Sequence, residues 1–99
     1  MTNTPVALSN EEIEFALQSL DGWTYDEEHK ALAKNFLFTD FSQAMGFMNA
    51  VALLADKMDH HPEWFNVYNK VNVMMTTHDV KGVSAFDVVM ATYMNEMAG

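Results

Sequence analysis

The segment Asp56-Lys-Met-Asp-His-His-Pro-Glu-Trp-Phe-Asn-Val-Tyr68 marks the point where a long helical pattern must give way to a strand. Proline lacks a backbone N–H and disfavours helix in the residue before it, so Pro62 requires the helix to end by His61. The adjacent imidazoles of His60 and His61 are therefore expected on a short junction between a helix and a strand.

Upstream of this junction, the sequence predicts a helix over about residues 41–58, capped by Thr39-Asp40 with Gln43 three residues after Asp40. Its apolar residues form two adjacent stripes that together cover about 180°, wider than the ~100° needed for packing on one sheet. We therefore expect this helix to meet a second surface, although methionine-rich helices also fill irregular cores. The stripes are Phe41, Ala44, Met45, Met48, Ala52 and Ala55, and beside them Phe47, Val51, Leu54 and Met58.

Downstream of the junction, the pattern predicts a hairpin rich in β-branched and aromatic residues, with strands over 63–68 and 71–76. The segment Thr77-His78-Asp79 follows the second strand. Because the return strand brings the chain back toward its start, we expect His78 to approach the His60-His61 pair. The sequence thus predicts three imidazoles around one pocket.

The rest of the chain supplies two more helices and one more hairpin. A capping box at Ser9-Asn-Glu-Glu12 begins a helix that is expected to end near Leu20. Residues 23–25 and 31–38 are strand-like, and a second capping box, Ser84-x-x-Asp87, begins the last helix.

The predicted element order is αββαββα over a single domain of residues 1–99. Short loops and antiparallel hairpins favour an α+β fold of two layers. We expect a four-stranded antiparallel sheet with three helices on one face.

Composition narrows the function. The net charge of −9 argues against direct binding to nucleic acid or to an anionic membrane, since both need clustered basic charge. The sequence contains no cysteine, which excludes a disulfide framework, a thiolate metal site and a cysteine nucleophile. No signal peptide or apolar run of about 18 residues is present. We expect a soluble cytoplasmic protein that binds a small molecule.

The spacing Asp56-x3-His60-His61-Pro62-x5-Tyr68-x9-His78-x8-Asp87 resembles the signature of the pterin-4a-carbinolamine dehydratase family. The resemblance implies a lyase, 4a-hydroxytetrahydrobiopterin dehydratase, which dehydrates 4a-hydroxytetrahydropterin to quinonoid dihydropterin. Such an enzyme recycles the pterin cofactor of aromatic amino-acid hydroxylases. The resemblance also implies a homotetramer assembled through the helix at 41–58. We expect its contacts to include Met45, Phe47, Met48, Val51 or Leu54.

The resemblance also implies the site residues. His60 and His78 would be the general acid and base, in either order, and His61 would hold the pterin. The expected catalytic residues are thus His60, His61 and His78, and the expected substrate contacts are His60, His61, Pro62, Thr77, His78, Asp79 and Val80. Asp56, Asp87 and Trp23 are possible supporting residues. Their structural alternatives are solvation of a helix end for Asp56, a capping box for Asp87 and core packing for Trp23.

The chemistry suits histidine. Dehydration of a carbinolamine protonates a leaving hydroxyl and removes a proton from the neighbouring nitrogen, and imidazole supplies both forms near neutral pH. The nitrogen lone pair expels the hydroxyl, so we expect no metal and no cofactor. His29 lies in a polar turn, and we assign it no role.

Two other functions are compatible with the sequence. Vertebrate members of the family that this chain resembles act as dimerisation coactivators of a homeodomain transcription factor, through the helix surface that otherwise makes the tetramer. A metal-binding protein would use His60 and His78 with Asp59 or Asp79. Adjacent histidines rarely serve one ion, and the i, i+4 histidine pair of common zinc sites is absent from the sequence.

Overall fold

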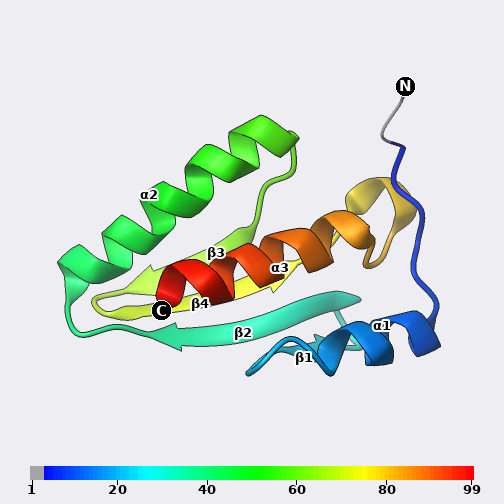
Figure 1. Ribbon diagram of the computed structural model, residues 1–99, viewed down its shortest axis with the longest axis horizontal. Coiled ribbons are helices and arrows are strands. Elements are labelled where there is room, and N and C mark those ends of the chain that lie inside the picture. The colour runs from blue at the N-terminus through cyan, green and yellow to red at the C-terminus, as the bar shows by residue number, and fades with distance from the viewer. Residues whose placement is uncertain (1–3) are drawn as a thin grey trace.

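The computed structural model describes residues 4–99 and follows the predicted order of elements (Figure 1). The described residues form α1 (Asn10–Leu17), β1 (Thr24–Asp26), β2 (Ala31–Leu37), α2 (Phe41–Met58), β3 (Glu63–Val67), β4 (Lys70–Met75), the 3-10 helix η1 (His78–Val80) and α3 (Ala85–Ala98). The predicted αββαββα order and α+β class are confirmed. The short η1 was not predicted.

The four strands form one antiparallel sheet in the order β1-β2-β4-β3. In the central pair, Leu32 lies opposite Met75 and Phe36 opposite Val71. Side chains alternate between the faces of a strand, so this register places Leu32, Phe36, Val71 and Met75 on one face. Figure 1 shows α2 and α3 across that face. The core between the layers includes Leu32, Phe36, Val71, Val73 and Met75, all nearly inaccessible to solvent.

Side chains cap the start of each α-helix as predicted. The hydroxyl of Ser9 accepts from the backbone N–H of Glu12, whose carboxylate accepts from the N–H of Ser9. The carboxylate of Asp40 accepts from the N–H of Gln43 at 2.9 Å. These bonds satisfy N–H groups that have no partner within the helix. No helix of residues 4–99 combines the length and apolar character that crossing a membrane requires.

The first helix ends three residues before the predicted Leu20. Beyond Leu17 the backbone tightens, with the N–H of Ser19 bonded to the carbonyl of Ala16 and that of Leu20 to the carbonyl of Leu17. These shorter-range bonds turn the chain out of the helix axis. Leu20 is nevertheless 3% exposed, so the predicted apolar contact forms without helical geometry.

The structure divides the apolar residues of α2 differently from the two predicted stripes, because Ala44 and Ala55 of the Phe41 stripe are also buried. Phe47 and Val51 are buried in the subunit's own core, whereas Phe41 and Met45 remain 49% and 38% exposed. The prediction that Phe47 or Val51 contacts a neighbouring subunit is therefore wrong. These two side chains face the sheet, and the free apolar surface lies on the side of Phe41 and Met45.

Trp23 lies in the core rather than beside the histidines. Its indole N–H donates to the side-chain carbonyl of Asn95 at 2.9 Å, and its ring meets Phe36 edge-on. Asn95 lies about three turns beyond the start of α3, so Trp23 packs at the other end of that helix from Asp87. Core packing, the structural alternative for Trp23, is therefore what the structure shows. Tyr68, a residue of the signature spacing, is 61% exposed in the β3–β4 turn.

Candidate active site

His60 is held by the way α2 ends. Asp59 takes the left-handed conformation at φ 52°, which aspartate tolerates better than most residues. The N–H of His60 then bonds to the carbonyl of Ala55 at 3.0 Å, and that of Asp59 to the carbonyl of Asp56. This pair of bonds is a Schellman motif, which closes the helix and fixes the next residue. Pro62 follows and prevents the helix from continuing.

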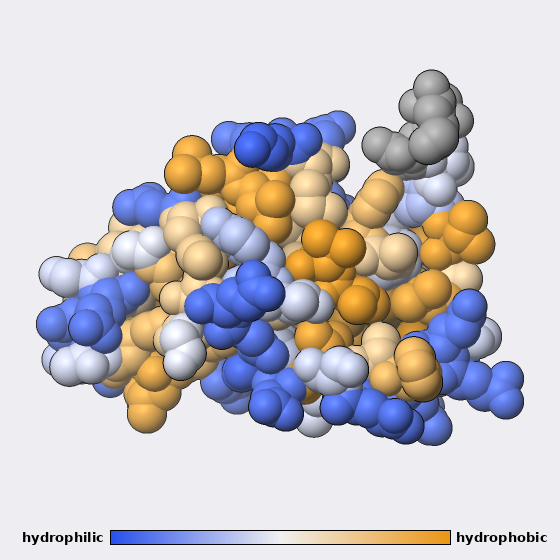
Figure 2. All heavy atoms as spheres, in the orientation of Figure 1, coloured by the Kyte–Doolittle hydropathy of each residue, from blue (hydrophilic) through white to orange (hydrophobic). Residues whose placement is uncertain are grey.

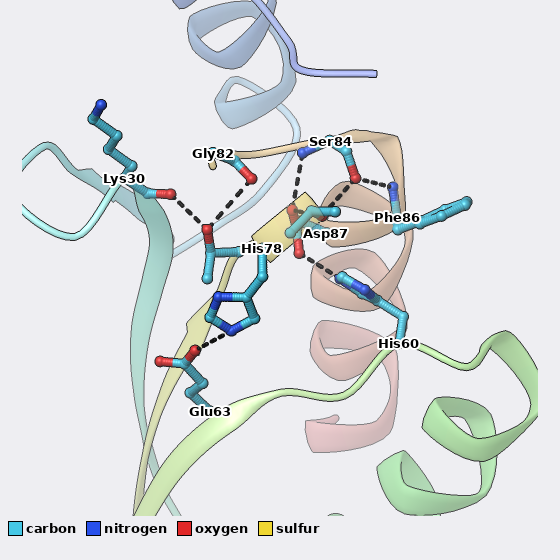
Figure 3. Close-up of polar contacts among 10 residues, drawn as sticks. Lys30, His60, Glu63, His78, Gly82, Ser84, Phe86 and Asp87 are labelled. Atoms are coloured by element: carbon cyan, nitrogen blue, oxygen red, sulfur yellow. Dashed lines mark hydrogen bonds and ion pairs between the residues drawn. The ribbon is translucent and has the colours of Figure 1, made fainter. Parts of the chain in front are cut away.

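The side chain of His60 is buried against α3. Its Nε2 lies 2.6 Å from Oδ1 of Asp87, a residue with no solvent exposure (Figure 3). The ring also packs against Phe86, with 5.6 Å between ring centroids. A short contact between an imidazole nitrogen and a carboxylate oxygen fixes both the position of the ring and the nitrogen that carries the proton.

The other carboxylate oxygen of Asp87 holds the second site segment. Oδ2 accepts from the hydroxyl of Thr77 at 2.7 Å and from the backbone N–H of Ser84 at 2.9 Å. The Ser84 bond is half of the predicted capping box of α3, which the structure contains. Asp87 therefore has the predicted capping role and a second set of contacts. It caps α3, and it contacts the histidine segment.

His78 lies on a tight loop between β4 and α3. Thr77 and Gly82 pair across the loop, with the N–H of Thr77 donating to the carbonyl of Gly82 at 2.8 Å. Between them the chain makes η1 and passes through Lys81 in the left-handed conformation. The imidazole of His78 is directed toward Glu63, with Nε2 2.9 Å from a carboxylate oxygen, and both side chains are largely exposed (Figure 3).

Two separate cavities flank the Thr77-His78 segment. One, of about 650 Å³, is lined by Pro5, Lys57, Met58, Asp59, His60, Thr77, Asp79, Phe86 and Val89. The other, of about 320 Å³, is lined by Glu28, His29, Lys30, Ala31, Glu63, Thr76, His78 and Lys81. Both volumes lie in the range of small-molecule sites. A groove of about 830 Å³ between α1 and α3 is larger, but no histidine lines it.

The three imidazoles that were expected around one pocket lie apart in this structure. His60 faces the larger cavity with Thr77 and Asp79, whereas His78 faces the smaller one. His61 is exposed, with Nε2 3.5 Å from Asp56, so that carboxylate lies beside a histidine as predicted. Convergence failed because η1 turns His78 toward β3, away from the buried ring of His60. Pro62 and Val80 are half-buried in the two segments.

Several residues of the site were not predicted. Phe86 and Met58 line the cavity of His60, and Glu63 pairs with His78. Glu63 belongs to the strand that follows the histidines, and only its antiparallel pairing with β4 brings it near His78. His29, to which no role was assigned, shares the cavity of His78. No group of three His, Cys, Asp or Glu side chains in residues 4–99 has a geometry that would hold a metal ion.

The fold and the buried His60–Asp87 pair define a small α+β protein with a buried imidazole–carboxylate contact at the junction of its helices and sheet. The family described as Pterin 4 alpha carbinolamine dehydratase matches residues 6–97. The chain belongs to this family, as its histidine spacing predicted. The predicted enzyme class, a hydro-lyase of this type, is thereby confirmed.

Individual relatives agree with this membership. A Rhodopseudomonas palustris (strain HaA2) protein named "Putative pterin-4-alpha-carbinolamine dehydratase" is 52% identical over 93% of this chain and 91% of its own length. A Brucella ovis protein of the same name is 49% identical over 93% of this chain and 95% of its own. A crystal structure described as transcriptional coactivator/pterin dehydratase from Brucella melitensis superposes with a TM-score of 0.93 at 48% identity, covering 95% of this chain and all of that one.

The pair of His29 and Asp26 generates a pH-dependent prediction. The side-chain hydrogen bond from Asp26 raises the pKa of His29 above 6.5, and the backbone N–H of His29 lowers the pKa of Asp26 below 3.8. The pair therefore stabilises the fold fully between those two ordinary values. Its contribution is lost as pH rises through the raised pKa of His29 or falls through the lowered pKa of Asp26.

We expect the melting-temperature difference between the unmodified chain and His29→Ala to be largest inside this window and to shrink on both sides. About 1 M salt should reduce it further, because the pair is exposed and screened. Thermal denaturation across pH measures both effects. A difference that is constant with pH would show that the pair contributes no charge interaction.

Proposed function

We propose that this chain dehydrates 4a-hydroxytetrahydropterin to quinonoid dihydropterin, with His60 and His78 as the general acid and base. One observation carries the proposal. The imidazole of His60 is fixed by the buried carboxylate of Asp87 at the wall of a cavity of about 650 Å³. Membership of the pterin carbinolamine dehydratase family supplies the substrate class.

The reaction moves two protons and releases one water. One imidazolium donates a proton to the hydroxyl on C4a, a neutral imidazole accepts the proton of the neighbouring nitrogen, and that nitrogen's electron pair forms the new C=N bond. Two histidines supply both forms near neutral pH. The chemistry requires no electron transfer and no covalent intermediate, so two imidazoles are sufficient.

His78 would reach the substrate from its exposed loop. Its side chain is 82% exposed and paired with Glu63, also at the surface. Exposed side chains change rotamer within nanoseconds, and a surface ion pair contributes little energy. We propose that substrate binding replaces this pairing and turns His78 toward the pterin.

The two loops would form the walls of the pterin site. We propose that His61 orients the pterin, and that Pro62, Thr77, Asp79 and Val80 contact it largely through their backbone. His60, Thr77 and Asp79 already line one cavity, which supports this arrangement. The product would return to pterin-dependent aromatic amino-acid hydroxylases. Absence of cysteine from the sequence supports a reducing compartment, and we propose the cytoplasm.

We also propose that the chain assembles as a homotetramer through α2. Phe41, Met45, Met48 and Ala52 recur at intervals of four, three and four residues, the spacing of a helix-bundle seam. Phe41 and Met45 remain exposed in the subunit. Figure 2 shows apolar side chains over α2 and α3. Contiguous apolar surface of this kind usually marks an interface.

A second function concerns the same surface. The Brucella melitensis relative is described as a transcriptional coactivator as well as a pterin dehydratase. A transcription-factor helix with an apolar stripe would occupy the exposed seam of α2 in place of another subunit. With a net charge of −9, the chain's effect on nucleic acid would be indirect.

The proposed reaction predicts turnover without metal. Purified protein should dehydrate 4a-hydroxytetrahydropterin at an undiminished rate in EDTA, because the two proton transfers need only imidazoles. Absorbance of the quinonoid product measures the rate. Loss of activity on chelation, with recovery on adding one divalent ion, would replace this proposal by a metal-dependent one.

Histidine variants should separate catalysis from binding. We expect His60→Ala and His78→Ala each to lower kcat by about 10²–10⁴-fold, the usual contribution of a general acid or base. His61→Ala should act more on KM. Steady-state kinetics distinguishes these effects. His29→Ala should leave both constants unchanged, and a comparable loss there would place the chemistry in the cavity that His29 shares with His78.

Assembly should depend on one side of α2. Met45→Glu should dissociate the tetramer into folded subunits, because burying an unpaired carboxylate costs several kcal/mol. Val51→Glu should instead unfold the subunit, since Val51 is buried in its own core. Leu53→Glu is the matched control, as Leu53 is 74% exposed elsewhere on the helix. Light scattering and circular dichroism separate these results, and a monomeric mass for the unmodified chain at micromolar concentration would contradict the proposal.

A further inference from the structure

We infer that Asp87 is a positioning residue that makes Nδ1 of His60, and not Nε2, the atom that exchanges a proton with the substrate. This inference rests on the proposed function. It adds the identity of the reacting nitrogen and the residue that selects it.

The hydrogen-bond count at Asp87 determines the tautomer. Its carboxylate faces the hydroxyl of Thr77, the backbone N–H of Ser84 and Nε2 of His60, at 2.7, 2.9 and 2.6 Å. An ionised carboxylate only accepts, so the Nε2 of His60 must carry the proton that it donates. The neutral ring is then protonated at Nε2 and has its lone pair at Nδ1.

Nδ1 of His60 is also the ring nitrogen that remains available. It makes no hydrogen bond within the part of the chain described by the structure, residues 4–99. Within the same residues, no buried side-chain nitrogen or oxygen lacks a partner. Nδ1 is therefore in contact with solvent, and the ring lines the larger cavity. A proton taken from or given to a ligand in that cavity must pass through Nδ1.

The same carboxylate joins the two loops of the site. Oδ1 contacts His60, two residues after the end of α2, and Oδ2 contacts Thr77, which directly precedes His78. The segments after α2, after β4 and before α3 thus meet at one buried group, and Figure 3 shows His60 and Ser84 beside it. A displacement of Asp87 would move His60 relative to the His78 loop. Misplaced catalytic groups lower kcat more than they weaken substrate binding.

The substitution Asp87→Asn tests this role because asparagine has the shape of aspartate but replaces one acceptor oxygen by an NH₂ donor. An amide offers one oxygen and one NH₂ group. Since two of the three donors meet Oδ2, we expect the amide oxygen to take that position and the NH₂ group to face His60. Nε2 must then accept, and the ring proton moves to Nδ1. The capping bond from Ser84 is retained, so α3 should still form.

The expected results are a tautomer change and a selective loss of kcat. Long-range hydrogen–nitrogen NMR correlations should find the proton of neutral His60 on Nε2 in the unmodified chain and on Nδ1 in Asp87→Asn. kcat should fall about 10²–10⁴-fold with KM little changed. In a His60→Ala background, adding Asp87→Asn should change kcat by no more than about twofold, because Asp87 acts through the missing ring.

The matched control is Ser9→Ala, which removes the side-chain acceptor of the other capping box, at α1. It should lower the melting temperature through loss of a cap and leave kcat and KM unchanged. If Asp87 had only a structural role, Asp87→Asn would likewise lower the melting temperature and preserve kcat in the folded fraction. If the effects of Asp87→Asn and His60→Ala on kcat were fully additive, the inference would also be overturned.

The NMR measurement needs neither substrate nor a variant. Neutral His60 protonated at Nδ1 in the unmodified chain would overturn the inference even if Asp87→Asn does not fold. If the unmodified chain fails to turn over the pterin, the proposed function is wrong, while the tautomer still reports whether Asp87 selects the free nitrogen.

Discussion

The buried carboxylate of Asp87 is the constraint on which the site depends. It has no solvent exposure, and it is satisfied by donors from the end of α2, the end of β4 and the start of α3. A buried carboxylate without partners is strongly unfavourable, so these three segments cannot separate without a large cost. One residue thereby links the helix layer to the sheet and holds both loops that carry the histidines.

The ends of the secondary elements position the chemistry. The Schellman motif at Asp59 fixes the backbone of His60, and the pairing of Thr77 with Gly82 closes the loop of His78. Neither histidine lies within an α-helix or a strand. Both histidines are positioned by backbone hydrogen bonds. Backbone groups at any helix end or loop closure need such partners, so the site uses bonds that the fold already requires.

The two histidines differ in their freedom. His60 is buried and fixed by Asp87 and Phe86, whereas His78 is exposed and paired with Glu63 at the surface. A fixed ring provides an oriented proton site, and an exposed ring can follow the substrate. A division of this kind suits a reaction with two proton transfers at neighbouring atoms, in which one group must be placed before binding and the other can move after it.

The sequence alone determined the order of elements, the starts of all three α-helices and the end of α2, because caps, Pro62 and apolar periodicity are local signals. The signature spacing was also sufficient to assign the family. Tertiary structure decided which apolar residues of α2 face the core, since both Val51 and Met45 are apolar and only packing distinguishes them. It decided that His78 turns toward Glu63, because strand register brings these residues together. The contact of Asp87 with His60 spans 27 residues, and no local pattern encodes a bond between side chains that only the closed fold makes adjacent.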